Sequence, residues 1–368
     1  MKYMVTLKPV GNYFFGGEVT LGDGTTQNYF VKSNLLPQAS ALLGLVRYEV
    51  LRQNNLLSYN LKDEDTLSQV KELIGESGFS LQQPVSQSDS TVNSFQKVWG
   101  IIQSISPVFL YQPEKDCYYT VERVDRKAKM SRTPDENDYS VLSVDRVEMK
   151  HSRCSYFPGE DSVAVQLVPD FQEKSYDYNT YWCDAKGVRL ALKGDIFTLT
   201  EKIGITKNGR KKNEKDAFFK QELVQLNPAL CMAFMVEIKV GHSLQGGESW
   251  VFLGGNRSMF QMKIQPLSNP DFDFRIYFED LHVDGSLLAL GDAYLPNEFR
   301  KACPFIWGIS VPFRYMENAI SDGHSWRKPK KSVLYNLQQR GSVIYAGKEQ
   351  LKQLNELPFQ HLGLNYFV

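Results

Sequence analysis

The chain has 368 residues, which is enough for two domains of ordinary size. Its 42 basic and 42 acidic residues leave no formal net charge, so any nucleic-acid site must be a local cationic patch and not a field over the whole surface. The opening residues, MKYMVTLKPV, lack the apolar core of a signal peptide, and no apolar run is long enough to cross a bilayer. We therefore expect a cytoplasmic protein without membrane contact.

Neither the cysteines nor the histidines are spaced as metal ligands. The five cysteines are far apart and form no CxxC pair, which argues against a zinc knuckle or a disulfide framework. The five histidines show no HxxxH spacing, and GxSxG, P-loop and GxGxxG motifs are absent. We therefore expect no catalytic residues, no metal and no cofactor.

The N-terminal residues predict a strand, a glycine loop and a helix in that order. Residues 3–10 predict a strand, and the aromatic segment after it ends in Gly16 and Gly17. Two glycines allow a positive φ or the close approach of another backbone, as RNA-contacting loops often require, although a simple turn has the same composition. A helix with an apolar stripe follows, with Ser40 as a plausible N-cap. From this helix Arg47 projects, either as a phosphate ligand or as an ordinary surface residue.

The range from 57 to about 165 has little regular periodicity, although residues 62–74 are helix-like. We interpret this range as an insertion that elaborates the first domain. Its basic segments, one of which contains His151, are explained by solvation as well as by contact with RNA or a partner.

A predicted hairpin within residues 200–225 carries a cluster of cations. Two β-prone stretches flank Asn208-Gly209, a strong hairpin signal, and Phe218 lies at the start of the second stretch. The cations of the loop and its borders include Lys207, Arg210, Lys211 and Lys212. Such a hairpin suits an anionic ligand, and a solvated surface hairpin explains the same charges.

A second glycine pair lies further along the chain. Gly254 and Gly255 are followed at once by Asn256 and Arg257, whose side chains donate hydrogen bonds, so this loop has the chemistry to cradle an anion. The connector PLSNPD then marks a domain boundary near residue 268. Beyond it we expect a strand over 272–283, short helices near 296–302 and 347–356, and a second small α+β domain.

Several motifs coincide in one order along the chain. They are FFGGE, the helix ASALLGLVRYEVL after a Leu-Pro, EKIGI with the basic hairpin and AFFKQELV, LGGNR, and QQRGSVIYA. In this order they resemble the RAMP superfamily of CRISPR proteins, and within it the family of the third Cmr subunit of type III-B effector complexes. The resemblance spans both ends of the chain and is weakest over 57–165. FFGGE and LLPQAS depart from the family's usual forms, and related type III-A and III-D subunits share the pattern.

The resemblance implies an α+β fold of two ferredoxin-like (RRM-type) domains, 1–268 and 269–368, with an irregular insertion at about 57–165 and a β-hairpin thumb at about 203–220. It implies a non-catalytic subunit that binds the 5′ tag of the guide RNA. Such a subunit contacts the large polymerase/cyclase-like subunit and the backbone RAMP subunit, and it meets target RNA indirectly. The RNA-binding residues it implies are Gly16, Gly17, Ser40, Arg47, Lys207, Arg210, Lys211, Lys212, Phe218, Gly254, Gly255, Asn256 and Arg257.

Two other functions remain open at this point. A RAMP-type endoribonuclease that processes precursor guide RNA would need a general base, and His151 is the only candidate near a basic segment, although an ordinary surface histidine is the simpler interpretation. A protein-interaction scaffold would use its basic loops for solubility alone.

Overall fold

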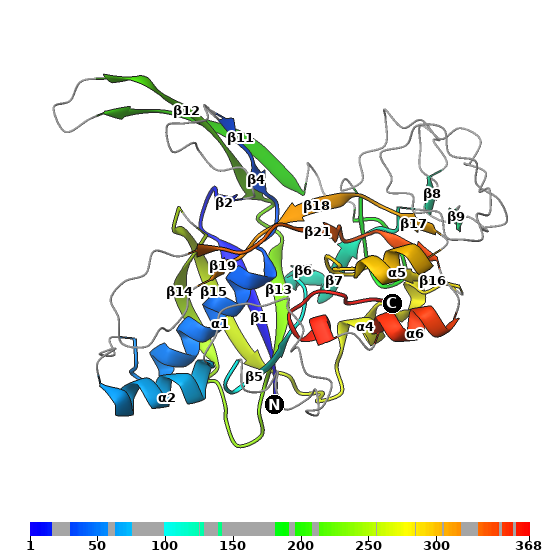
Figure 1. Ribbon diagram of the computed structural model, residues 1–368, viewed down its shortest axis with the longest axis horizontal. Helices are drawn as coiled ribbons and strands as arrows, with labels where there is room; N and C mark the ends of the chain where they lie inside the picture. Colours follow the sequence, from blue (N-terminus) through cyan, green and yellow to red (C-terminus); the bar gives the residue numbers. More distant parts are fainter. Residues whose placement is uncertain are drawn as a thin grey trace. The chain divides into compact units, whose positions relative to one another are not determined.

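The structure is a computed structural model with a mixed α+β fold (Figure 1). It describes residues 1–16, 30–57, 63–75, 99–124, 126–128, 139–141, 181–190, 196–207, 213–254, 256–283, 285–303, 305–317, 330–345, 348–355 and 358–368. Within these ranges, no helix combines the length and the apolarity that crossing a membrane requires.

The chain forms two compact units, and each draws on separate stretches of sequence. The first unit consists of Met1–Lys115, Leu192–Ser268 and Phe313–Leu334, and the second of Asp116–Ala191, Asn269–Pro312 and Tyr335–Val368. The change of unit after Ser268 coincides with the boundary expected from the sequence. The composition of the sequence did not indicate that each unit also takes up segments from other parts of the chain.

The first unit is built around an antiparallel sheet. Its elements are β1 (Lys2–Pro9), β2 (Phe15–Gly16), β3 (Phe30–Val31), β4 (Ser33–Asn34), α1 (Ala39–Gln53), α2 (Glu64–Ile74), β5 (Ile102–Ile105), β6 (Phe109–Gln112), β11 (Phe197–Lys207), β12 (Asn213–Leu226), β13 (Cys231–Ile238), β14 (Gly247–Leu253), β15 (Ser258–Pro266), β19 (Met316–Glu317) and β20 (Lys330–Lys331).

The central sheet has β1 in its middle. The strand order is β6-β13-β1-β15-β14, with β5 also paired to β13, and the neighbouring strands are antiparallel. Strand β13 is a nearly continuous apolar run, LCMAFMVEI with its preceding residue, and seven of its eight positions are buried. Strands β5 and β6 come from the range that the sequence presented as an insertion, so part of 57–165 belongs to the central sheet itself.

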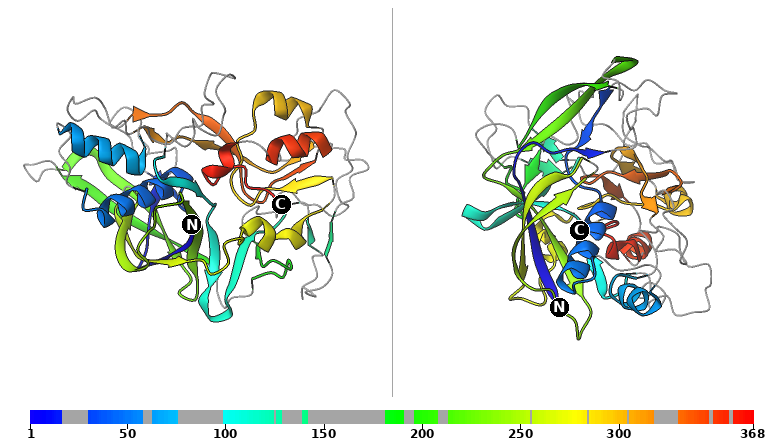
Figure 2. Two further views of the ribbon diagram at one scale, coloured as in Figure 1. Left: turned by 90° about the horizontal axis from the view of Figure 1, so that it is seen from below. Right: turned by 90° about the vertical axis from the view of Figure 1, so that its left-hand side faces the viewer.

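Helix α1 follows the predicted pattern except at its start. The apolar residues expected on its stripe, Leu42, Leu43, Leu45, Val46, Val50 and Leu51, are all buried. Both α1 and α2 lie on one face of the sheet (Figure 2). The N-cap is Gln38 and not Ser40, and its side chain makes no capping hydrogen bond. The prediction of Ser40 as N-cap is therefore wrong, because the helical backbone begins one residue earlier, at Ala39.

The predicted hairpin is present and longer than expected. Strands β11 and β12 pair from Phe197–Leu226 outward, and Ile203 faces Lys220 across the ladder. A bulge lies between Ile205 and Lys207. The strands project well beyond the central sheet of the same unit (Figure 1). At the base, β3 adds a third strand, parallel to β12.

The second unit contains short strands and helices. They are β7 (Cys117–Val121), β8 (Arg126–Ala128), β9 (Tyr139–Val141), β10 (Trp182–Cys183), α4 (Phe274–Tyr277), β16 (Ser286–Leu288), α5 (Asn297–Ala302), β17 (Phe305–Trp307), β21 (Tyr335–Gln338), β22 (Val343–Tyr345) and α6 (Lys348–Asn355), while β18 (Ser310–Phe313) ends where the first unit resumes. Strand β22 lies between β16 and β17. Around these strands, Leu295, Ile306, Ile344 and Leu354 belong to one buried apolar cluster.

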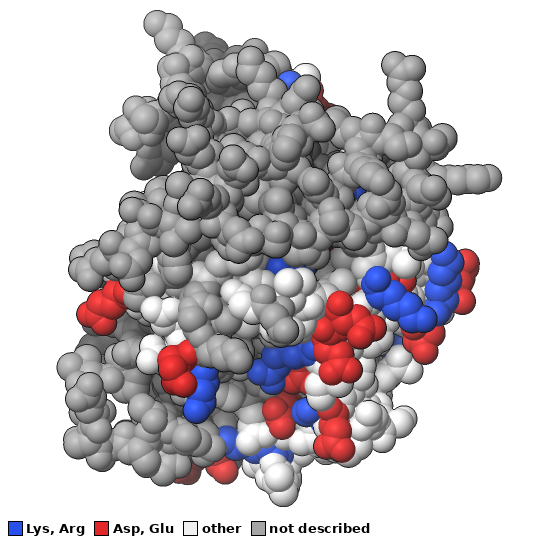
Figure 3. All heavy atoms as spheres, turned by 90° about the vertical axis from the view of Figure 1, so that its right-hand side faces the viewer, with Lys and Arg blue, Asp and Glu red and all other residues white. Residues whose placement is uncertain are grey.

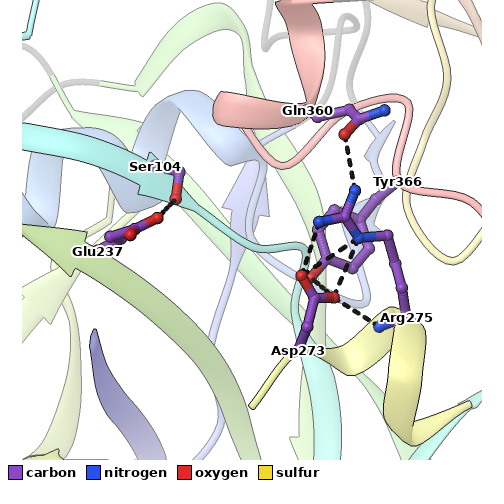
Figure 4. Close-up of polar contacts among 6 residues, drawn as sticks. All are labelled: Ser104, Glu237, Asp273, Arg275, Gln360 and Tyr366. Carbon is purple, nitrogen blue, oxygen red and sulfur yellow. Dashed lines mark hydrogen bonds and ion pairs between the residues drawn. The ribbon is translucent and has the colours of Figure 1, made fainter. Parts of the chain in front are cut away.

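The strand expected over 272–283 is wrong, because Asp273 starts a helical turn there. Its carboxylate accepts a hydrogen bond from the backbone N–H of Arg275 at 2.7 Å, which caps α4. The Arg275 guanidinium returns to the same carboxylate at 2.7 Å, and the Tyr366 hydroxyl donates to it at 2.5 Å. Arg275 also donates to the Gln360 side chain (Figure 4). Local capping chemistry thus overrides the alternating polarity of the segment.

This network generates a prediction about acid stability. Burial tends to raise the pKa of Asp273, but the hydrogen bonds from Arg275 and Tyr366 prevail and hold it below its usual value. The resulting stabilisation is present above the ordinary carboxyl pKa of about 3.9 and is lost as the pH falls below it. Because Asn still caps a helix, Asp273→Asn should remove mainly the charge pairing, at a cost of about 1–2 kcal/mol at neutral pH.

Urea midpoints measured from pH 7 down to acid test this expectation. The difference between the wild type and Asp273→Asn should shrink below about pH 4, because the Asp273 carboxyl of the unfolded chain then takes up a proton more readily than that of the folded protein. Asp271→Asn, which alters an exposed carboxylate two residues away, is the matched control and should change the midpoint little at any pH. A difference between Asp273→Asn and wild type that stays constant into acid would contradict the assignment.

Candidate nucleic-acid interface

Three segments that are distant in sequence meet at one end of the first unit's central sheet. They are the aromatic segment 13–16, the turn between β14 and β15, and the base of the β11/β12 hairpin. The sequence singled out each of them separately. Direct backbone contacts join them in the structure.

The turn between β14 and β15 depends on two residues with positive φ. Leu253 and Ser258 close the ladder, and the N–H of Arg257 donates to the carbonyl of Gly254 at 3.0 Å. The φ of Gly254 is +81° and that of Arg257 is +52°. Asn256 and Arg257 are exposed at the tip of this turn, so their side chains are accessible to an anion.

Gly254 lies directly against the aromatic segment. A Cβ atom on Gly254 would stand 2.6 Å from the carbonyl oxygen of Phe14, closer than real Cβ contacts allow. Next to it, the N–H of Phe14 donates to Ser258 Oγ at 3.0 Å. The first and second glycine motifs are therefore neighbours, which their separation in sequence did not indicate.

The aromatic segment is anchored by buried rings. Phe15 stacks on Phe260 with centroids 5.7 Å apart, and Tyr13 lies 4.9 Å from Phe15. The Tyr13 hydroxyl donates to the carbonyl of Leu35 at 2.8 Å, and burial raises the pKa of this phenol well above its usual range. These rings hold the backbone up to Gly16, which is exposed and whose carbonyl accepts from Asn34 Nδ2 at 3.3 Å.

The same segment also holds the hairpin. The backbones of Tyr13 and Val224 exchange two hydrogen bonds, at 2.8 and 2.9 Å. Asn12 Nδ2 donates to Thr200 Oγ1 at 3.0 Å, so β11 is tied as well. The position and direction of the hairpin base therefore depend on residues 12 and 13.

An ion pair and a ring stiffen the hairpin stem. Lys220 pairs with Glu201 at 2.7 Å, and its ammonium group lies 5.1 Å from the centre of the Phe30 ring. An exposed pair of this kind contributes little stability on its own. It does occupy this lysine, which is then a poor candidate for binding phosphate.

The residues predicted on helix α1 lie away from these contacts. Ser40 is half-buried in the first turn of α1. Arg47 is half-buried as well, and burial lowers the pKa of its guanidinium to about 10. The role of Arg47, as a phosphate ligand or as an ordinary surface residue, stays a prediction.

The described residues thus bring Gly16, Gly254, Asn256 and Arg257 into one region. Gly17, Arg210, Lys211, Lys212, Gly255 and His151 lie outside the described residues, and for Lys207 and Phe218 only the backbone is described. The roles assigned to all of these residues remain predictions. Sequence reasoning missed Tyr13, Ser258 and Val224. Tyr13 and Val224 pair through their backbones and Ser258 Oγ accepts from the Phe14 N–H, and such contacts leave no motif.

Other chemistry in the described part of the chain is limited. No group of three His, Cys, Asp or Glu residues there could hold a metal ion. On the face shown in Figure 3, described basic and acidic side chains are intermixed, and neither sign forms a single patch. This distribution agrees with the equal numbers of basic and acidic residues in the sequence.

The fold is found in known structures. This chain aligns over 99% of its length, and 96% of the other chain's, with one in "Cryo-EM structure of the Type III-B Cmr-beta bound to cognate target RNA and AMPPnP, state 1", at 12% identity and a TM-score of 0.50. A chain of the same complex bound to cognate target RNA gives 11% identity, coverages of 100% and 96%, and a TM-score of 0.49. A chain of the Csm3-Csm4 subcomplex of a type III-A CRISPR-Cas interference complex gives 10%, coverages of 94% and 93%, and a TM-score of 0.34.

The first of these likenesses shows a fold of the class found in subunits of CRISPR effector complexes. A search of curated proteins gave no match. The family model described as CRISPR-associated protein (Cas_Cmr3) matches residues 5–272, well over half of the chain. The chain therefore belongs to the CRISPR-associated Cmr3 family, as the order of motifs in the sequence indicated.

The close approach at Gly254 leads to a stability prediction. Gly254→Ala should lower the free energy of unfolding by about 1–3 kcal/mol, because alanine at this φ is strained and its Cβ would collide with the Phe14 carbonyl. Gly44→Ala is the matched control: Gly44 is an exposed residue of α1 with no atom within 4 Å of the position that a Cβ would take, and the substitution should add up to about 1 kcal/mol. Thermal unfolding measures both. Equal stability of Gly254→Ala and wild type would contradict this packing.

Proposed function

We propose that this protein is a non-catalytic subunit of a type III-B CRISPR effector complex that binds the 5′ tag of the guide RNA. In this proposal it also docks the large polymerase/cyclase-like subunit and the backbone RAMP subunit, and meets target RNA indirectly. The observation that carries the proposal is the junction of the glycine turn, the aromatic segment and the hairpin base at one end of one sheet. Membership of the Cmr3 family supports it.

The chemistry of the junction suits an unpaired RNA strand. Such a strand is irregular, so it is held by cations and backbone N–H groups on its phosphates and by aromatic faces on its bases. The exposed Asn256 and Arg257 provide donors at the turn. The hairpin carries a local excess of lysine and arginine between Lys207 and Lys215, with five cations against one acidic residue. In a chain with no formal net charge, such a local excess attracts RNA to the hairpin.

The first unit is, in this proposal, a derived ferredoxin-like domain. Its strand order β15-β1-β13-β6 with antiparallel neighbours corresponds to the arrangement 4-1-3-2 that a β-α-β-β-α-β chain produces. Helix α1 provides the first crossover. Between β13 and β15 the described residues contain strand β14 in place of a second helix, so the domain departs from the regular form at this point.

Docking to protein subunits has support along the hairpin stem. Leu199 and Ile203 are exposed to 53% and 59%, and they share one face of β11, which is an edge strand of the three-stranded hairpin sheet. Exposed apolar residues on an edge strand favour a protein neighbour over solvent or phosphate. The stem and the basic loop of the hairpin would therefore meet different partners.

The basic loop provides a direct test. Replacing Arg210, Lys211 and Lys212 by alanine should weaken binding of repeat-derived RNA and flatten its salt dependence by roughly 0.7 log units per decade of salt for each phosphate that is no longer neutralised. Fluorescence anisotropy over a salt series gives both quantities. The control removes the same charge from exposed Lys115, Lys186 and Lys352. Unchanged affinity and slope in the loop variant would contradict the proposal.

The non-catalytic role is tested separately. Purified full-length protein incubated with repeat RNA should leave it intact with and without divalent cations, since the sequence offers no convincing general base. Gel analysis of end-labelled RNA detects any cleavage. Cleavage that disappears in His151→Ala would establish the endoribonuclease alternative instead.

A further inference from the structure

The open face of the central sheet carries a regular grid of exposed side chains. On β14, Trp250 and Phe252 are 62% and 63% exposed, whereas the intervening Val251 is buried. This alternation places both aromatic rings on one face. Helices α1 and α2 cover one face of this sheet (Figure 2), and the exposed rings lie on the other face.

Strand register extends the face across two further strands. Phe252 pairs with Met259 and Trp250 with Gln261 on β15, and Gln261 pairs in turn with Lys8 on β1. Side chains at paired positions lie on the same face of a sheet. The grid therefore has one row on each strand: Glu248, Trp250 and Phe252 on β14; Lys263, Gln261 and Met259 on β15; and Thr6, Lys8 and Val10 on the β1 side. Each column crosses the three strands, and the middle column is Trp250, Gln261 and Lys8.

Polar and cationic groups surround the Trp250 ring. Its cross-strand neighbours in the middle column are the Gln261 amide and the Lys8 ammonium group, and Lys263 lies two residues from Gln261 along β15, on the same face. Glu248 is the single acid of the grid, and it accepts a hydrogen bond from Gln261 Nε2 at 3.1 Å. The face thus combines stacking surfaces with an excess of positive charge.

The grid is continuous with the candidate interface described above. One residue separates Phe252 from Gly254, where the glycine turn begins, and Arg257 lies exposed on the other side of that turn. The two rings are spaced by two residues of strand, or about 6.8 Å, so each ring can face its own base of an unstacked strand. A strand leaving the turn would therefore reach Phe252 first and Trp250 next.

We propose that this face is a base-stacking platform for single-stranded RNA, on which Phe252 and Trp250 receive consecutive unpaired bases while Lys8 and Lys263 face the phosphates. This inference rests on the proposed function and adds the path of the strand beyond the glycine turn. A protein neighbour would be expected to cover a contiguous apolar patch. Here the apolar residues Phe252, Met259 and Val10 occupy only one end of the grid. The set that crosses its middle, Trp250, Gln261 and Lys8, is an aromatic ring beside an amide and an ammonium group, which is the chemistry that recognises bases and phosphates.

Replacing the rings by leucine separates stacking from burial. Leucine keeps apolar surface but has no π face, so Trp250→Leu should weaken binding of a fluorescein-labelled oligouridylate by about tenfold, and the double variant with Phe252→Leu by more. The salt slope should stay unchanged, because no charge is removed. Trp250→Phe should retain most of the affinity. Tyr48→Leu, which alters an exposed aromatic residue on α1, is the matched control and should bind as wild type does.

The outcomes are distinct from those of the loop variant. If the double leucine variant binds the oligouridylate within twofold of wild type while the variant lacking Arg210, Lys211 and Lys212 loses affinity and slope, the platform is overturned and the proposed function stands. If wild type shows no affinity for the RNA, both fail. If the double leucine variant keeps RNA affinity but no longer co-purifies with co-expressed complex subunits, the face docks protein and the platform is again overturned.

Discussion

The absence of a side chain at Gly254 is the constraint on which the interface depends. The turn after β14 can therefore come within contact distance of the Phe14 carbonyl, and the Phe14 N–H reaches Ser258 Oγ. The backbone of the preceding residue, Tyr13, pairs with that of Val224. One close approach therefore sets the relative positions of a turn, a loop and a projecting hairpin. Any side chain at this position would separate the elements by displacing the backbone of the aromatic segment.

Buried rings hold this junction together with a few polar contacts. Tyr13, Phe15 and Phe260 pack as one cluster beneath segment 13–16, and strand β1, which leads directly into that segment, is hydrogen-bonded on both sides. The rings fix the backbone of segment 13–16, against which Gly254 packs. In the proposed function, this junction would position the RNA and the cations of the hairpin would attract it.

Much of the fold was accessible from the sequence, and the reasons for the failures are physical. The spacing of apolar residues in the sequence indicated the correct element for β1, α1, β13 and the hairpin, because each has a long and regular apolar pattern. The strand expected at 272–283 failed because one carboxylate, Asp273, caps a turn and gathers Arg275 and Tyr366, and a window average does not register a single capping residue. The packing of Gly254 against Phe14 and Phe15 was not predictable, since it depends on strand order and not on either motif. The same holds for the grid around Trp250, which appears only once β14, β15 and β1 are in register.

The third strand at the base of the hairpin has a consequence for how this projection can vary. Where β3 pairs with β12, at Lys220 and Gln221, three strands resist bending, whereas further out only two remain and a bulge interrupts them. The outer part of the hairpin can therefore differ in length by whole residue pairs without changing the strand pairing at its base. Because side chains alternate with every residue, an even change of length on each strand preserves which side the outer part presents, and an odd change reverses it.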